Sequence, residues 1–212
     1  MSRILIAVPT YENIYPDTFK SIYQLDDGGN EVDFDFFRGY DVASARNFIG
    51  QGTIDRGYDY VMMVDNDVVL PKDALVNLLE TERSYPLGRC MAVGYYLLRS
   101  AKNIESRKTP IFRFAGKHFL KEDAYTVKEL KEMQENGVKK IQIRGSGLGC
   151  ALIHRSIFER MEYPWFQWTV RKNGRQFSED LFFCNRFGEI QTPIFVDTRV
   201  SCGHLMRHID YE

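Results

Sequence analysis

The sequence has no hydrophobic run that approaches the length of a membrane span, so nothing in it predicts a transmembrane helix. The apolar run at 4–8 is too short for the core of a signal peptide and leads directly into the motif at 8–13. We therefore expect a cytoplasmic protein. The net charge of −1 provides no overall attraction to nucleic acid or to an anionic membrane.

Cysteine is also scarce, and no two cysteines form a Cys-x-x-Cys pair. This spacing lacks the ligand pairs of a zinc site, and a disulfide framework is not expected in a cytoplasmic protein. We expect reduced and mostly buried thiols at Cys90, Cys150, Cys184 and Cys202.

The 212 residues suffice for one α/β domain with a full core, and we expect a single domain over 1–212. Strand-like and helix-like patterns alternate in the first part of the chain. This alternation predicts a doubly wound, mostly parallel sheet with helices on both faces. The predicted strands are 3–8, 32–37 and 60–64, and the predicted helices are 14–25, 43–56 and one that begins at Leu70-Pro71.

The stretch at 58–73 carries the strongest chemical signal. A buried strand at 60–64 ends in Asp65-Asn66-Asp67, although an unpaired buried charge is costly. Residues two apart in an extended strand point the same way, so the two aspartates should share a face at the carboxyl end, where open α/β sheets place ligands. Two hard oxygen ligands there would suit Mg²⁺ or Mn²⁺ carrying a phosphate. The alternative is a polar strand end with an acidic turn.

The composition changes after a predicted strand at 90–98. Residues 99–140 contain eleven Lys or Arg and six Asp or Glu, a local charge of +5 that leaves −6 for the rest of the chain. Thr126-x-x-Glu129 is a capping box, which predicts a helix that ends near Gly137. We interpret 99–140 as an insertion over one edge of the sheet. It is either a solvated charged face or a lid or platform for an anionic acceptor.

Residues 141–154 predict a strand, a glycine-containing loop and a second strand. The glycines do not form a dinucleotide-binding fingerprint, because that motif requires a helix directly after them. They instead favour the close approach of a ligand or of another backbone segment. The remaining predicted elements are helices at 155–161 and 179–187 and a strand at 193–200, with an aromatic segment at 163–170.

Glu179 and Asp180 fall in the first turn of their predicted helix. Acids in that position interact favourably with the helix dipole, which is reason enough for their presence. A general base is also consistent with this position if the helix starts near the ligand edge of the sheet.

Two basic side chains are further candidates. His204 lies in a polar tail and is a chemically reasonable third metal ligand, with His208 a weaker one, although a lone histidine is more often a surface or core residue. Arg46 could bind a phosphate bidentately, or it could pair on the surface with Asp41 or Asp55.

Six motifs, in order along nearly the whole chain, resemble those of the GT-A glycosyltransferases, especially the family-2-like branch. Each motif is weak alone, and the likeness lies in their order and spacing. They are VPTYEN at 8–13, SARN at 44–47, VDNDVVLPKDAL at 64–75, GSGLGCALIHRSIFERM at 145–161, SEDLFFCNR at 178–186 and CGH at 202–204.

The resemblance implies a GT-A fold and a soluble enzyme that transfers a sugar from a nucleotide-diphospho-sugar to an acceptor hydroxyl. It implies Mn²⁺ or Mg²⁺ bound by Asp67, Asp65 and His204, and a UDP-sugar in preference to a GDP-sugar. It implies Asp180 as the base of an inverting reaction, with Glu179 beside it. The donor-binding residues that it implies are Pro9, Thr10, Tyr11, Glu12, Arg46, Asp65, Asn66 and Gly147.

The acceptor is not identified by the sequence. Trp165 and Trp168 are weak candidates for stacking on a sugar ring. The basic insertion is compatible with a saccharide, a cell-wall polymer or a modified nucleic acid as acceptor.

The sequence departs from the family pattern after the second strand, where family-2 members usually have an acidic turn that contacts uridine. Here that strand ends in FFRGYD at 36–41, which leaves the nucleotide base open. The QxxRW signature of processive synthases is absent, so polymer extrusion is not expected. A late histidine also occurs in retaining relatives, which leaves the stereochemistry open.

Two other functions compete with glycosyl transfer. One is a nucleotidyltransferase on a related fold. The sequence argues against it, because no GxG(T/S)R-type phosphate loop follows the first strand. The other is a non-catalytic nucleotide-sugar-binding module. The sequence argues against this module because all the candidate metal-binding and catalytic side chains are present: Asp65, Asp67, Asp180 and His204.

Overall fold

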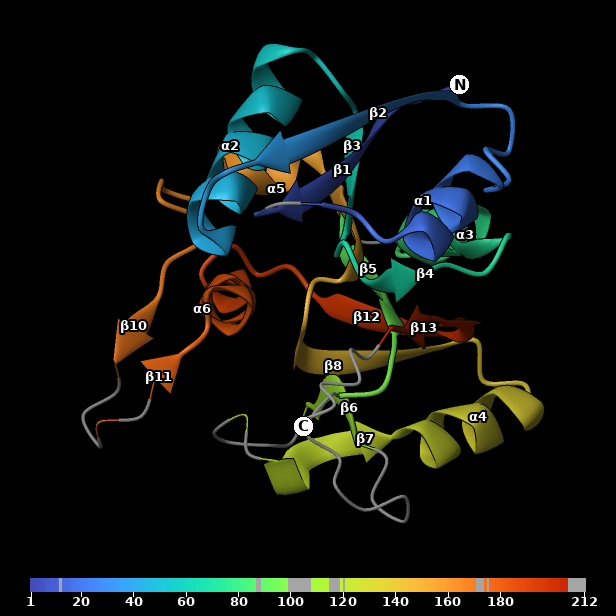
Figure 1. The fold of residues 1–212 in the computed structure, drawn as a ribbon. Helices are drawn as coiled ribbons and strands as arrows, with labels where there is room; N and C mark the ends of the chain where they lie inside the picture. The colour runs from blue at the N-terminus through green and yellow to red at the C-terminus, as the bar shows by residue number, and fades with distance from the viewer. Residues whose placement is uncertain are drawn as a thin grey trace, which may run out of the picture.

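In the computed structural model of the protein, a nine-stranded sheet extends through the molecule and helices pack along both of its faces (Figure 1). The strand order is β2-β1-β3-β9-β5-β12-β8-β6-β7. The structure describes residues 1–11, 13–86, 89–98, 108–114, 119, 121–170, 174 and 176–205.

The strands of this sheet are β1 (Arg3–Thr10), β2 (Glu31–Arg38), β3 (Tyr60–Val64), β5 (Met91–Tyr95), β6 (Lys108–Arg113), β7 (Ala124–Thr126), β8 (Lys140–Ser146), β9 (Cys150–His154) and β12 (Ile194–Ser201). Two short ribbons lie outside it: β4 (Val68–Val69) with β13 (Gly203–His204), and β10 (Thr169–Val170) with β11 (Gln176–Phe177). The helices are α1 (Pro16–Tyr23), α2 (Val42–Asp55), α3 (Ala74–Arg83), α4 (Val127–Glu135), α5 (Arg155–Arg160) and α6 (Glu179–Asn185), with short 3₁₀ turns η2 (Lys121–Asp123) and η3 (Arg186–Gly188).

The sheet is mixed, whereas the sequence predicts a mostly parallel one. β1 pairs in parallel with β2 and β3, and β5 pairs in parallel with β12. The pairs β3-β9, β9-β5, β12-β8, β8-β6 and β6-β7 are antiparallel. The alternating pattern predicts parallel pairing only where a helix connects neighbouring strands. It could not reveal that β9 enters between β3 and β5 in the opposite direction.

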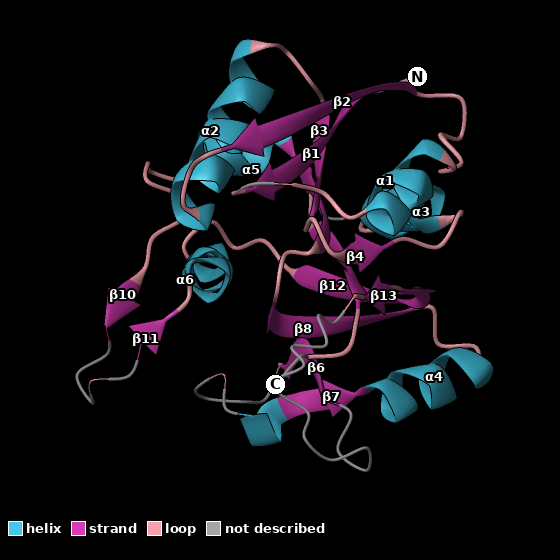
Figure 2. Cartoon of the chain, in the orientation of Figure 1, coloured by secondary structure: helices cyan, strands magenta, loops and turns pink. Residues whose placement is uncertain are grey.

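Helices cover both faces of the sheet, as the sequence predicts (Figure 2). Ile4 and Ile6 of β1 belong to the buried cluster that includes apolar residues of α1 and α3. Leu5 and Ala7 point the other way and belong to the cluster that includes residues of α2, α5 and α6. Burial of each large apolar side chain contributes about 1.5–3 kcal/mol. The two buried clusters therefore anchor β1 and β3 on both faces, and these strands end at the site described below.

The predicted charged insertion extends the sheet instead of lying over its edge. Its described part forms β6, β7 and α4, and β6 pairs with β8 to continue the sheet. The capping box is confirmed, because the Thr126 side chain accepts from the backbone of Glu129 and the Glu129 side chain accepts from the backbone of Thr126. The other residues of the predicted insertion, at 99–107, 115–118 and 120, lie outside the described residues.

The predicted start of the third helix is wrong by a few residues. Pro71 does not open the helix, since α3 begins at Ala74 after a turn. All four cysteines are buried free thiols, as expected. Within the described ranges, no helix has both the length and the hydrophobicity that a membrane crossing requires.

Candidate functional site

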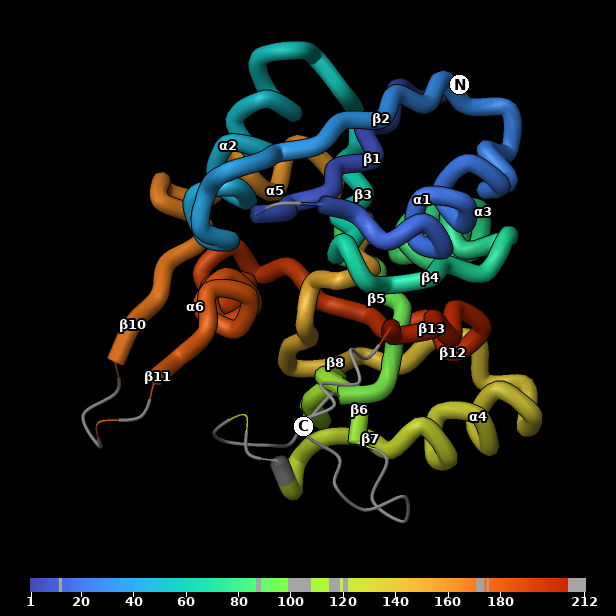
Figure 3. Tube along the Cα trace, in the orientation of Figure 1, coloured from blue at the N-terminus to red at the C-terminus, as the bar shows by residue number. Residues whose placement is uncertain are grey.

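A cavity of about 800 Å³ lies at the carboxyl ends of β1 and β3, the edge at which the sequence predicts a ligand. The starts of α2 and α6 lie side by side in the chain trace (Figure 3). Residues at both helix starts line the cavity, as does His204 of β13. Glu12 and His208 lie outside the described residues. Most of the other predicted site residues line the cavity: Pro9, Thr10, Tyr11, Arg46, Asp65, Asn66, Asp67, Trp168, Glu179, Asp180 and His204.

Asp67 and His204 meet because β13 pairs antiparallel with β4, the two residues that directly follow Asp67. Their side chains are largely buried, and Nε2 of His204 lies 3.6 Å from Oδ1 of Asp67. Nδ1 of His204 lies 2.6 Å from the carbonyl oxygen of Leu97. A carbonyl oxygen only accepts, so we assign the proton to Nδ1, and Nε2 faces Asp67.

This pair fits part of a divalent-cation site. A carboxylate oxygen and an imidazole nitrogen are ligands for Mn²⁺, and a ligating histidine usually donates its other N–H to a carbonyl or carboxylate. In the described ranges, no group of three or more His, Cys, Asp or Glu side chains is arranged to hold a metal ion. A cation bound by Asp67 and His204 would need further oxygen ligands from a bound molecule and from water.

Arg46 forms a buried bridge at the base of the cavity. Its Nη2 lies 2.8 Å from Oδ1 of Asp65, and its Nη1 donates to Oε1 of Glu179. Arg46 is 3% exposed. Both terminal nitrogens bind protein carboxylates, so the geometry does not favour the bidentate phosphate contact that the sequence suggests for Arg46. The same ion pair occupies Oδ1 of Asp65, which therefore faces Arg46 instead of a cation.

Asp180 is held at the start of α6 by local hydrogen bonds. Its Oδ1 accepts from the Ser178 hydroxyl and, at 2.7 Å, from the backbone N–H of Leu181. Burial raises the pKa of Asp180, against the opposing effect of Arg46, and burial likewise raises the pKa of Glu179. Desolvation therefore outweighs the local hydrogen bonds to Asp180, although the start of a helix favours a charged acid. A raised pKa makes a carboxylate a better proton acceptor.

Asn66 supports the loop after β1. Its Nδ2 donates to the Asn13 carbonyl at 2.7 Å and to Thr10 Oγ1 at 3.2 Å, and its own carbonyl accepts from the Tyr15 N–H. Tyr11, in the same loop, is 72% exposed at the cavity. Asn66 thus shapes the loop after β1 instead of projecting freely into the cavity.

Two predicted residues lie elsewhere. Trp165 is a core residue, 4% exposed, and its Nε1 donates to the carbonyls of Phe158 and Met161. It does not line the cavity, whereas Trp168 does and is 43% exposed. Gly147 also lies behind the wall, where an added Cβ would come within 2.6 Å of the Tyr96 hydroxyl. The glycine therefore makes room for a side chain of the wall and not for a ligand.

The sequence reasoning missed several residues of the wall. Tyr40, half exposed, and Asp41 follow β2, at the place where the sequence departs from the GT-A family-2 pattern. Asp41 caps α2, because its Oδ1 accepts from the N–H groups of Ala43 and Ser44. The sequence Gly-Tyr-Asp before a helical pattern could have indicated this turn. Nothing in the sequence indicated Tyr96.

The cavity is acidic. The described residues that line it include five carboxylic acids and a single arginine: Asp41, Asp65, Asp67, Glu179, Asp180 and Arg46. An anionic ligand would be repelled by this wall unless a cation accompanied it.

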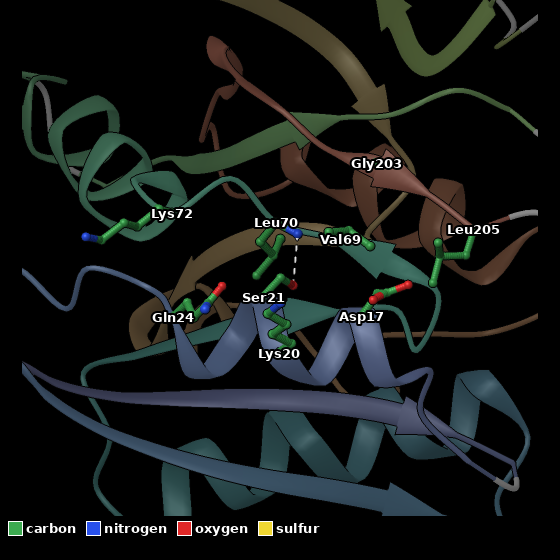
Figure 4. Close-up of a pocket in the computed structure, with 9 residues that line it drawn as sticks. All are labelled: Asp17, Lys20, Ser21, Gln24, Val69, Leu70, Lys72, Gly203 and Leu205. Atoms are coloured by element: carbon green, nitrogen blue, oxygen red, sulfur yellow. Dashed lines mark hydrogen bonds between the residues drawn. The ribbon is translucent and has the colours of Figure 1, made fainter.

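A second cavity of about 510 Å³ is lined by residues of α1 and of the β4-β13 ribbon (Figure 4). None of the predicted site residues lines it. The hydroxyl of Ser21 points to the ribbon and accepts from the N–H of Leu70 at 3.0 Å. This bond ties α1 to the segment that carries Asp67.

Comparison with protein-family models and with curated proteins finds no match. Among solved structures, the chain is similar to A197 from STIV, with a TM-score of 0.63 and 19% identity over 97% of this chain and 86% of that one. It is also similar to GalNAc-T7, solved with UDP, GalNAc and Mn²⁺, with a TM-score of 0.60 and 11% identity over 98% of this chain and 45% of that one. At such identities the likeness shows the fold alone, a mixed α/β, Rossmann-like arrangement with distant GT-A similarity.

Proposed function

We propose that the protein is a metal-dependent glycosyltransferase that moves a sugar from a nucleotide-diphospho-sugar to an acceptor hydroxyl. The observation that carries this proposal is the meeting of Asp67 and His204 in an acidic cavity whose opposite wall holds Asp180. The sequence motifs and the fold shared with a protein solved with UDP, GalNAc and Mn²⁺ support the same reaction.

The acidic wall explains why the donor would need a cation. A diphosphate carries negative charge and would meet five carboxylic acids in this cavity. When bound, Mn²⁺ or Mg²⁺ would neutralise the charge that develops on the departing diphosphate. Asp67 and His204 are the residues that would hold it, and the Leu97 carbonyl fixes the orientation of the imidazole.

The nucleoside would lie over the loop after β1, with a UDP-sugar as the favoured donor. Tyr11 and Tyr40 are both exposed at this side of the cavity and offer aromatic faces to a base. Trp168 is exposed at the cavity and offers a similar face to a sugar of the acceptor.

Asp180 would act as the general base of an inverting reaction. Its carboxylate takes the proton of the acceptor hydroxyl while that oxygen attacks the anomeric carbon and the bond to the diphosphate breaks. Ser178 and the Leu181 N–H hold the carboxylate in one orientation. Glu179 is engaged by Arg46, so its role is to fix the bridge to Asp65.

Calorimetric titration with UDP and with GDP, in Mn²⁺ and then in EDTA, tests the proposal. We expect UDP to bind in Mn²⁺ and to lose at least about tenfold in affinity in EDTA or after Asp67→Ala or His204→Ala, by analogy with the loss of metal-site partners. Asp73→Ala is a matched control, because Asp73 is exposed and makes no capping bond with its side chain. Equal affinity with and without the cation would overturn the metal-dependent function.

A further inference from the structure

The hydroxyl of Tyr96 has no role in the proposed function, although it lies in the wall of the same cavity. Tyr96 directly follows β5 and is 6% exposed. Its ring packs edge-on against the imidazole of His204, with centroids 5.1 Å apart. A buried hydroxyl needs hydrogen-bond partners, because leaving it without them is costly.

Two glycines make the space that the phenol occupies. A Cβ added at Gly147 would come within 2.6 Å of the Tyr96 hydroxyl, and one at Gly149 would come within 2.8 Å. The same Cβ at Gly149 would lie 2.8 Å from Oδ2 of Asp65. The hydroxyl and the carboxylate therefore converge on one small region above Gly149.

The two oxygens that converge there have complementary hydrogen-bonding capacity. The Tyr96 oxygen accepts from the Gly149 N–H at 3.1 Å, and the described part of the chain supplies no acceptor for its proton. A phenol remains protonated at neutral pH and can therefore donate. Asp65 uses Oδ1 to bind Arg46, and its Oδ2 faces the hydroxyl region as an acceptor.

A donor and an acceptor side by side are what a sugar hydroxyl requires, since it both gives and receives a hydrogen bond. We propose that Tyr96 and Asp65 bind one hydroxyl of the transferred sugar, and that Tyr96 is a specificity-determining residue for the donor sugar. Tyr96 donates to the oxygen of that hydroxyl, and the hydroxyl donates to Oδ2 of Asp65. This inference rests on the proposed function.

Tyr96→Phe removes the donor and keeps the ring against His204. Affinities for UDP, UDP-glucose, UDP-galactose, UDP-GlcNAc and UDP-GalNAc are measured by calorimetry in Mn²⁺. We define the gain over UDP as the affinity for the tightest-binding UDP-sugar divided by the affinity for UDP. This gain should fall roughly 3- to 10-fold in Tyr96→Phe, the usual contribution of one hydrogen bond. Affinity for UDP itself should not change.

Tyr95→Phe is the matched control, because Tyr95 is the adjacent tyrosine, is fully buried and does not line the cavity. It should leave the gain over UDP unchanged. A second measurement uses analogues of the preferred UDP-sugar that each lack one hydroxyl. One of these analogues should bind the unmodified protein roughly 3- to 10-fold more weakly than the parent UDP-sugar does. The affinity of that analogue should fall little further in Tyr96→Phe, because the contact is already missing.

An unchanged gain in Tyr96→Phe, or deoxy analogues that all bind like the parent, would overturn the assignment and leave the glycosyltransferase proposal standing. A loss of UDP affinity equal to the loss of UDP-sugar affinity would also overturn it, because the phenol would then act through Gly149 or His204. Failure of every nucleotide to bind the unmodified protein in Mn²⁺ would overturn both proposals.

Discussion

Two clusters of arginine, carboxylate and tyrosine lie at opposite ends of β3, and they differ in charge balance. At the amino end, Glu82 is 1% exposed, accepts from the Tyr60 hydroxyl at 2.9 Å and pairs with Arg89 at 3.2 Å. One carboxylate there meets one arginine. At the carboxyl end, Arg46 is shared by Asp65 and Glu179, and Asp180 and Asp67 add further acid.

The difference distinguishes a structural cluster from the proposed binding cluster. The balanced cluster has a donor for each Glu82 oxygen and needs no ligand. The unbalanced cluster holds buried carboxylates in excess, which costs folding free energy unless a proton or a cation neutralises them. Excess charge that is kept despite this cost is typical of a functional site.

The sharpest test of this contrast is Asp180→Asn, which keeps size and removes the base. Sugar transfer in single turnovers should fall by roughly 10²–10⁴-fold, the usual worth of general base catalysis. Donor affinity, measured by titration, should barely change because Asp180 is not a proposed metal ligand. Full activity would shift the role to Glu179 or to a reaction without a protein base, and loss of donor binding would place Asp180 in the donor site.

Substitution of Glu82, in the cluster at the amino end of β3, should lower the stability of the protein and leave nucleotide binding unchanged. Glu82→Ala leaves the buried Tyr60 hydroxyl without its acceptor, which costs roughly 1–3 kcal/mol in the free energy of unfolding. Urea unfolding measures this loss, and titration of the folded variant with UDP and Mn²⁺ should match the unmodified protein. A change in nucleotide affinity as large as the change in stability would mean that the two clusters are coupled.

The smallest expected effect is the pH dependence of stability at the cavity. Burial raises the pKa of Asp180, so the native state holds this proton more tightly than the unfolded chain does. The contribution of Asp180 to stability is therefore lost as pH rises from about 4 through the folded pKa. Relative to the unmodified protein, Asp180→Asn should gain stability as pH rises, which denaturant unfolding at several pH values measures.

Asp41 provides the control of opposite sign, at the rim of the same cavity. Hydrogen bonds from the side chain and backbone of Ser44 lower the pKa of Asp41. Its contribution to stability is present above the unfolded pKa of about 4 and is lost as pH falls through the folded value. Asp41→Asn should therefore lose stability, relative to the unmodified protein, as pH rises. Parallel behaviour of the two variants would contradict the proposed difference in environment.

Local patterns predicted local structure well. The apolar runs placed β1 and β3, and the capping box placed the start of α4. The start of α3 was misplaced because Pro71 suits a turn as well as the first turn of a helix. The position of β9 between β3 and β5 depends on pairing between distant segments, which no local pattern records.

In the candidate site, too, the sequence indicated individual residues and did not indicate their contacts with distant parts of the chain. The sequence points to Asp65, Asp67, Asp180 and His204 because carboxylates at a strand end and at a helix start, together with a late histidine, suit metal or base chemistry, although each position also has an ordinary structural explanation. The weak prediction of an acceptor contact at Trp165 is wrong, because an aromatic residue in a loop segment can serve the core as readily as a surface.

By itself the sequence determined the α/β class, the burial of β1 and the chemical types present at the carboxyl ends of β1 and β3, because these depend on side-chain periodicity and on neighbours in the chain. Only the tertiary structure decided the partners: Arg46 between two carboxylates, His204 against Asp67, and Tyr96 above two glycines. The reason is physical. Each of these contacts joins residues far apart in the chain, and their burial and mutual charge exist only after the strands have paired.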